Sequence, residues 1–105
     1  MKEYIYKLTL VERLFVADNW TDEDEQTVFE HFEHLKDLLH QNKLILAGKT
    51  AGLDNTTYGI VVFQASDWEE ANTIMNRDPA LQHGIMTAVL HEYNVALHNP
   101  NFTKK

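Results

Sequence analysis

The sequence predicts an α+β domain whose elements follow the order β-α-β-β-α-β. Three observations support this prediction. Four segments carry the alternating or continuous apolar residues typical of strands. Two segments begin with the capping residues typical of helices. A polar linker over 51–57 separates the two middle strands. A chain of 105 residues that is 44% apolar has the length of one domain and enough apolar side chains for a core.

The first strand is expected over residues 2–12, where large side chains alternate along the chain. Because successive side chains of a strand point to opposite faces, both faces of this strand are predicted to be fairly apolar. One face carries Tyr4, Tyr6, Leu8 and Leu10, and the other carries Ile5, Thr9 and Val11. The loop over 13–20 that follows is more aromatic than a simple connection requires, since it contains Phe15 and Trp20.

The first helix is predicted to begin after Thr21, whose hydroxyl can cap it, and the acidic run 22–25 suits the positive end of the helix dipole. We interpret that run as a solvated helix start. An apolar stripe follows at helical spacing. Its members are Val28, Phe32, Leu35 and Leu39. The helix is expected to end near Gln41, because Asn42 tolerates the left-handed conformation that stops a helix.

The second half of the chain predicts a hairpin, a helix and a last strand. Strands are expected over 43–50 and 58–64, joined by the polar linker. A capping box of Ser66 and Glu69 predicts a helix over 67–77, and Asp78 before Pro79 closes it. A short turn over 80–83, a strand over 86–97 and a frayed tail complete the chain. We expect a single domain over 1–98 with 99–105 as the tail.

This order of elements is the split arrangement of ferredoxin-like folds, with a four-stranded antiparallel sheet. Two helices can cover only one face of such a sheet, yet the strands carry large apolar residues on both. An uncovered apolar face of that width favours aggregation. The sequence therefore predicts a homodimer whose sheets pack face to face.

Charge and composition exclude several classes of function. The net charge of −7 disfavours nucleic acid and anionic membranes as partners. No apolar run reaches the length of about 20 residues that a transmembrane helix needs. The chain has no cysteine, which excludes disulfides and thiol chemistry and is compatible with the cytoplasm, where we expect this protein. No phosphate loop, dinucleotide fingerprint or nucleophile elbow is present, and we expect no cofactor.

Of the six histidines, His31 differs by its position. It lies about 60° from the apolar stripe of the first helix, at 100° per residue, and an inward-pointing imidazole needs a hydrogen-bond partner. His31 is thus a candidate for chemistry or a satisfied structural histidine. His34, three residues on, is expected at the margin of that sector. No third ligand stands at a recognisable spacing, so no metal site is predicted. Asp78 is a candidate partner, although its position also suits a simple cap.

Several stretches in combination are similar to the YciI-like (YCII-related) family of dimeric α+β barrel proteins, over about residues 3–98. The first stretch runs from His31 through Lys43-Leu44 to Ala47-Gly48, and the second is 58–63. The third runs from Glu70-Ala71 through Asp78-Pro79 to Gly84. The 19–21 and 47–50 stretches resemble one branch of the family. Asn42 stands where the family commonly has glycine, and Lys49 where proline often follows the Ala-Gly pair.

The resemblance implies a pocket between helices and sheet in which His31 and Asp78 form a catalytic dyad. The chain is then expected to be a lyase or isomerase that performs general acid/base chemistry on a small aromatic or carbonyl compound. The expected binding residues are Tyr6, Arg13, Phe15, Trp20, His34, Lys49 and Tyr58, with Lys49 or Arg13 near an oxyanion. The alternative is a non-catalytic domain that binds a small ligand in the same pocket. A haem-binding function would need a histidine on the sheet side of the pocket.

Overall fold

The computed structural model describes residues 1–102, and the predicted order of elements is confirmed. The strands are β1 (Lys2–Leu10), β2 (Leu44–Lys49), β3 (Gly59–Ala65) and β4 (Met86–Tyr93). The helices are α1 (Asp22–His40), α2 (Trp68–Asn76) and the short α3 (Pro79–Gln82). Two 3₁₀ turns, η1 (Glu12–Phe15) and η2 (Ala17–Asn19), occupy the segment that was expected to be a loop.

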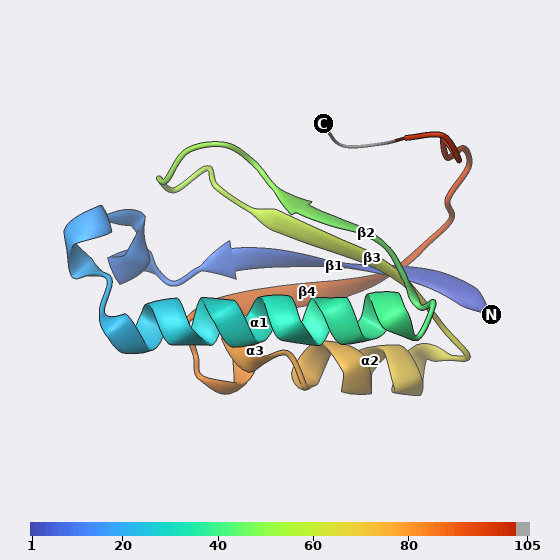
Figure 1. Ribbon diagram of the computed structural model, residues 1–105, viewed down its shortest axis with the longest axis horizontal. Coiled ribbons are helices and arrows are strands. Elements are labelled where there is room, and N and C mark those ends of the chain that lie inside the picture. The colour runs from blue at the N-terminus through green and yellow to red at the C-terminus, as the bar shows by residue number, and fades with distance from the viewer. Residues whose placement is uncertain (103–105) are drawn as a thin grey trace.

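The four strands form one antiparallel sheet in the order β2-β3-β1-β4. The central strand β1 pairs with β3 on one side and with β4 on the other, which places Tyr6 opposite both Val61 and Leu90. All three α-helices lie on the same side of this sheet, with α1 running along it (Figure 1). The predicted α+β architecture, with its helices on one face, is therefore confirmed.

The main core lies between the sheet and the helices. Tyr4, Tyr6 and Phe63 are fully buried there, and Leu35 and Leu38 of α1 pack against them. A second, smaller cluster consists of Leu14, Ala80 and Ile85. It attaches the η1 turn to α3, so the segment before α1 and the segment that begins with Asp78 support each other.

The buried face of α1 differs from the predicted stripe. Leu35 is buried as expected, but Phe32 and Leu39 are 54% and 56% exposed. The buried residues are Asp24, Thr27, His31, Leu35 and Leu38. The buried face is therefore rotated from the predicted stripe by less than one residue step. Its polar members Asp24, Thr27 and His31 are hydrogen-bonded to Arg13, to the Glu23 carbonyl and to Asp78, respectively. His31, predicted at the side of the stripe, lies at its centre.

Two helix ends confirm or correct the capping predictions. Asn42 has a φ of 60°, the left-handed conformation expected after α1. The capping residue of α2 is Asp67, which accepts a hydrogen bond from the Glu70 amide, so the predicted pair of Ser66 and Glu69 is wrong by one position. Glu70 reaches back to the amide and hydroxyl of Ser66. Asp67 therefore caps α2, and the Glu70 side chain bonds to the residue before the cap, so the two do not form a reciprocal capping box.

The last strand ends at Tyr93, and the prediction that it extends to Leu97 is wrong. Its pairing partner β1 begins at Lys2, and Tyr93 already lies opposite Glu3, so almost no partner remains beyond it. The chain leaves the sheet there, with the Val95 amide bonded to the Glu3 carboxylate. A domain boundary at residue 98 stays a prediction, and 103–105 of the predicted tail lie outside the described residues. Within the described part, no helix has the length and hydropathy needed to span a bilayer.

Candidate active site

His31 and Asp78 are brought together by α1 and the start of α3. The Nδ1 atom of His31 lies 2.7 Å from Oδ1 and 2.8 Å from Oδ2 of Asp78. Both side chains are buried, the carboxylate completely. The two residues are 47 positions apart in the sequence, and only the packing of α3 against α1 makes this contact.

The local sequence aims the Asp78 side chain. Pro79 forces Asp78 out of the helical conformation, and its backbone is extended with φ −62° and ψ 122°. As the N-cap of α3, Asp78 accepts a hydrogen bond from the Ala80 amide to Oδ1 at 2.9 Å. The cap and the histidine partner are thus the same carboxylate. The hydroxyl of Tyr6 donates to Oδ2 at 2.8 Å.

These contacts keep the carboxylate ionised. Burial alone raises the pKa of Asp78, but the hydrogen bond and charge of His31, with the Ala80 amide and the Tyr6 hydroxyl, outweigh burial and lower it. Burial, the Asp78 charge and the hydrogen bond raise the pKa of Tyr6, which therefore remains a donor. Since an ionised carboxylate only accepts, Nδ1 of His31 carries the proton, and in the neutral ring Nε2 has a free lone pair.

The His31 ring forms part of the wall of a pocket of about 300 Å³ between α1 and the ends of β1, β2 and β3. Among residues 1–102, no side chain or backbone group is hydrogen-bonded to Nε2. The remaining wall is mostly apolar, with Trp20, Phe32, Leu8 and Met86 among its members. A volume of this size suits a ligand of one or two rings. His31 is therefore one of the few polar residues in the wall of a mostly apolar pocket.

The pocket carries no carboxylate although the protein has a net charge of −7. Its ionisable wall residues are His31, Lys49 and Tyr58. The Lys49 ammonium donates to the carbonyl of Thr50 at 2.7 Å and to that of Gly52 at 3.4 Å, which fixes it at the base of the 50–57 loop. Lys7 lies over the Tyr58 ring, 4.6 Å from its centroid. A neutral or anionic ligand suits these charges better than a cation does.

Three of the seven expected binding residues, Trp20, Lys49 and Tyr58, line the pocket. Tyr6, Phe15 and His34 lie outside its wall. Tyr6 approaches Asp78 from the sheet, behind the histidine. His34 is one helical turn beyond His31 on α1, where burial lowers its pKa, and its Nε2 has no hydrogen-bond partner among the described residues. Phe15 is in η1, partly buried away from the pocket.

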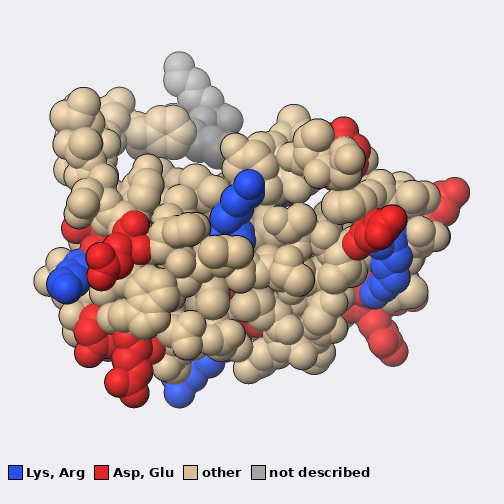
Figure 2. All heavy atoms as spheres, turned by 180° about the vertical axis from the view of Figure 1, so that it is seen from behind, with Lys and Arg blue, Asp and Glu red and all other residues tan. Residues whose placement is uncertain are grey.

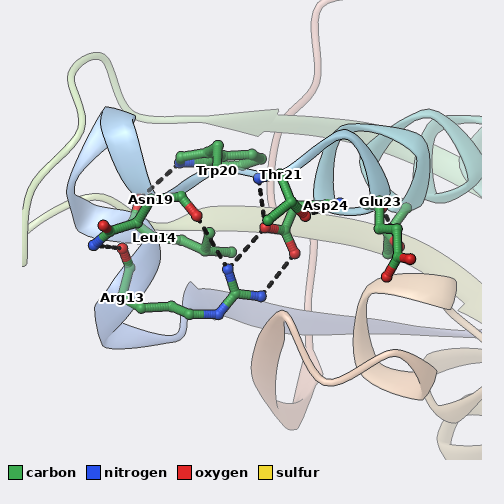
Figure 3. Close-up of polar contacts among 8 residues, drawn as sticks. Arg13, Leu14, Asn19, Trp20, Thr21, Glu23 and Asp24 are labelled. Atoms are coloured by element: carbon green, nitrogen blue, oxygen red, sulfur yellow. Dashed lines mark hydrogen bonds and ion pairs between the residues drawn. The ribbon is translucent and has the colours of Figure 1, made fainter.

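Arg13, expected near an oxyanion, also lies outside the wall and is engaged elsewhere (Figure 3). Its guanidinium binds both oxygens of Asp24, with Nη1–Oδ2 and Nη2–Oδ1 distances of 2.8 and 2.7 Å. Asn19 donates to the Arg13 carbonyl, and the Trp20 indole donates to the Leu14 carbonyl at 3.0 Å. These bonds fasten the segment between β1 and α1 and hold Trp20 in the pocket wall.

Sequence reasoning missed two parts of the site. Phe32 and Leu53 line the pocket, but Phe32 was assigned to the core and Leu53 to a polar linker. A large apolar residue within a polar linker is the signal that would have identified Leu53. His91, the histidine in the sheet, pairs with Ile5 on the face away from the helices, so it is not on the sheet side of this pocket.

Comparison with known proteins agrees with this fold. The model of the YCII-related domain matches residues 6–91, most of the chain. The chain belongs to the YCII-related domain family. Among solved structures, it resembles 5-chloro-2-hydroxyhydroquinone dehydrochlorinase from Burkholderia phenoliruptrix AC1100, in complex with 2,5-dihydroxybenzoquinone. The TM-score is 0.66 at 15% identity, over 88% of this chain and 93% of that one, which establishes a shared fold. Among curated proteins, none matches the sequence.

Proposed function

We propose that this YCII-related protein is an enzyme that uses His31 as a general acid/base in a lyase or isomerase reaction on a small aromatic or carbonyl compound. One observation carries the proposal. The imidazole donates from Nδ1 to an ionised, buried Asp78 and forms part of the wall of an apolar pocket, with Nε2 unbonded. A carboxylate at one ring nitrogen fixes the tautomer and stabilises the imidazolium that forms when the other nitrogen takes a proton.

In an elimination, Nε2 of His31 removes a proton from the substrate. The electron pair of the broken bond to hydrogen forms a new π bond, and the leaving group departs with the pair of its own bond to carbon. The imidazolium then returns the proton to the leaving group or to water, so the electrons and the proton of this step balance without an added oxidant or reductant. In an isomerisation, it returns the proton to another atom of the substrate. Such proton transfer contributes about 10²–10⁴-fold to a rate.

The pocket wall supports a flat, oxygen-bearing substrate. Trp20 and Tyr58 offer aromatic surfaces, and Lys49 offers the pocket's fixed positive charge. Two of the three ammonium protons of Lys49 are used by loop carbonyls, which leaves one for a substrate oxyanion. The relative of known structure is described as acting on a chlorinated hydroxyhydroquinone and holds a dihydroxybenzoquinone. Hydroxylated aromatic rings are therefore the first probes to use.

The test measures turnover and binding with those probes. We expect the wild-type protein to release chloride from 5-chloro-2-hydroxyhydroquinone and to bind 2,5-dihydroxybenzoquinone. His31→Gln should lower kcat by about 10²–10⁴-fold and change the Kd for the quinone by less than about tenfold. His83→Gln, at an exposed histidine beside Glu30, is the matched control. Wild-type binding without turnover would favour the alternative, a non-catalytic binding domain. Equal turnover by wild type and His31→Gln would contradict the role of His31 as the general acid/base.

We also propose a homodimer formed through the uncovered sheet face. Outward-facing residues on this face are apolar on several strands, and Leu46 and Val89 are 51% and 58% exposed. Seen from the side away from α1, most charged side chains lie toward the two ends of the molecule (Figure 2). A second copy of the same face would cover such a surface.

Light scattering on a sizing column tests this proposal. We expect wild type to have twice the mass of a 12.2 kDa chain. The double variant Leu46→Lys, Val89→Lys should have the mass of one chain. Phe29→Lys is the control, because Phe29 is 57% exposed on α1, away from the sheet. A wild-type protein with the mass of one chain, or a double variant that remains dimeric, would contradict a sheet-to-sheet dimer.

A further inference from the structure

Tyr6 has a contact that the proposed reaction does not yet use. Its side chain leaves the middle of β1 toward the helices and is fully buried. Its ring packs edge-on against Phe63, with centroids 5.7 Å apart. The hydroxyl then reaches Oδ2 of Asp78 at 2.8 Å. Because Tyr6 is outside the pocket wall, it does not touch a ligand bound in the pocket.

Each oxygen of the Asp78 carboxylate has a hydrogen-bond donor of its own. Oδ1 has the Ala80 amide as its own donor, and Oδ2 has the Tyr6 hydroxyl as its own donor. Nδ1 of His31 is shared by the two oxygens at nearly equal distances of 2.7 and 2.8 Å. With one donor fixed at each oxygen, the carboxylate cannot rotate without losing a bond, and the imidazole is held between its two oxygens.

We propose that Tyr6 is a positioning residue, whose hydroxyl fixes the Asp78 carboxylate and, through it, the direction in which His31 presents Nε2 to the pocket. This inference rests on the proposed function for its catalytic consequence, although not for its structural one. Ala80 contributes through its backbone, so Tyr6 is the side chain whose removal frees one oxygen while the other remains bonded.

No neighbouring group replaces this donor. His34 is the other titratable side chain that interacts with both Asp78 and His31. Burial is the main cause of its lowered pKa, so its neutral form is favoured. Its Nε2 has no hydrogen-bond partner among the described residues, so it does not donate to the Asp78 carboxylate. Loss of the Tyr6 hydroxyl would therefore leave Oδ2 with only its share of the His31 proton.

Tyr4 provides a matched control. It lies two residues earlier on the same strand, faces the same core and is also fully buried. It contacts the same Phe63 ring, at 6.0 Å between centroids. Its hydroxyl, however, has no hydrogen-bond partner among the described residues. Tyr4→Phe and Tyr6→Phe thus remove the same atom from similar surroundings, and only the second breaks a bond to Asp78.

The experiment reads the His31 ring proton by ¹⁵N-edited NMR and turnover of 5-chloro-2-hydroxyhydroquinone. We expect Tyr4→Phe to match wild type in both. Tyr6→Phe should make exchange of the Nδ1 proton with water at least about tenfold faster, since a released carboxylate lets the ring move. It should lower kcat by roughly 10–100-fold, as loss of partners behind a functional side chain does, with little change in KM. A purely structural role would leave the ring proton unchanged.

A second measurement avoids any loss of fold in Tyr6→Phe. Incorporation of 3-fluorotyrosine into a protein with Tyr4, Tyr58 and Tyr93 changed to Phe labels Tyr6 alone. It keeps the Tyr6 hydroxyl and makes it a stronger donor, so the Nδ1 signal should shift although no bond is lost. An unchanged ring proton in Tyr6→Phe, or in the fluorinated protein if Tyr6→Phe does not fold, would overturn the inference. An altered ring proton in a protein whose wild type has no turnover would support positioning and contradict the proposed reaction.

Discussion

Two buried carboxylates, Asp24 and Asp78, differ in what their partners can do. Both lie at the start of a helix, both are at most 4% exposed, and both have a lowered pKa. Asp24 binds the Arg13 guanidinium, which does not titrate at any ordinary pH (Figure 3). Asp78 binds an imidazole through Nδ1, and the second nitrogen of that ring can accept a proton. A buried carboxylate needs a hydrogen-bonded partner in either case. The partner's chemistry distinguishes the structural pair of Asp24 and Arg13 from the candidate catalytic pair of Asp78 and His31.

The surroundings strengthen this contrast. Arg13 and Asp24 are only 11 positions apart in the sequence, and their ion pair holds the segment that leads into α1. Every donor to Asp24, including the Thr21 amide, belongs to that same stretch of chain. The donors to Asp78 come from β1, α1 and α3, and one of them faces the pocket. Asp78 therefore joins three elements beside the pocket, and the proposed reaction depends on this carboxylate and not on Asp24.

The largest expected effect of the contrast is on turnover. Asp78→Asn should lower kcat with 5-chloro-2-hydroxyhydroquinone by on the order of 10³–10⁴-fold, because an amide no longer fixes the productive tautomer of the histidine. Asp24→Asn, assayed at a temperature where it is folded, should retain kcat within about twofold. Steady-state kinetics on both variants checks this. Equal losses in the two variants would remove the distinction between the pairs.

The next effect is on stability. Tyr6→Phe should lower the free energy of unfolding by about 1.5–3 kcal/mol, because it removes a hydrogen bond to a buried charged group. Tyr4→Phe should change it by less than about 0.5 kcal/mol, because its hydroxyl has no partner to lose. Urea unfolding followed by circular dichroism measures both. A larger loss in Tyr4→Phe than in Tyr6→Phe would show that ring packing, not the bond to Asp78, dominates.

The pair of Asp24 and Arg13 should make the stability of the protein sensitive to acid. Guanidinium and amide hydrogen bonds hold the pKa of Asp24 well below its usual value of 3.8. A carboxyl with a lowered folded-state pKa stabilises the fold above its unfolded value and loses that contribution as the pH falls further. The midpoint temperature of unfolding of the wild type should therefore fall as the pH is lowered below about 4. Asp24→Asn should be less stable than wild type at pH 7, and its midpoint temperature should fall less over the same range of pH. Parallel pH curves for both proteins would contradict this role for the pair.

The smallest expected effect belongs to His34. Its pKa is lowered, chiefly by burial, from the usual 6.5, so the unfolded chain takes up a proton first as the pH falls. Stability contributed by the neutral ring is present at higher pH and is lost as the pH falls below about 6.5. His34→Gln should lose less stability than wild type between about pH 7 and 5. Thermal melts at these two values are sufficient, and identical changes in both proteins would argue against a buried neutral ring.

Local chemistry explains why much of the fold was predictable. Thr21, Asn42 and the Asp78-Pro79 pair act within a few residues of themselves, so caps and helix ends follow from the sequence. The pairing of His31 with Asp78 came from family resemblance, since spacing does not reveal a contact over 47 residues. The contacts of Tyr6 with Asp78 and of Arg13 with Asp24 were not predicted, because alternation places a side chain on a face but does not identify the group it meets there.

The proposed reaction depends most on how the His31 ring is held, and ¹⁵N chemical shifts of that ring measure its protonation and orientation directly. In the neutral ring we expect a single tautomer, protonated at Nδ1 and bare at Nε2, whose Nε2 shift moves when 2,5-dihydroxybenzoquinone is added. A ring that carries its proton on Nε2, or that averages both tautomers and ignores the quinone, would contradict a base held by Asp78 and directed into the pocket.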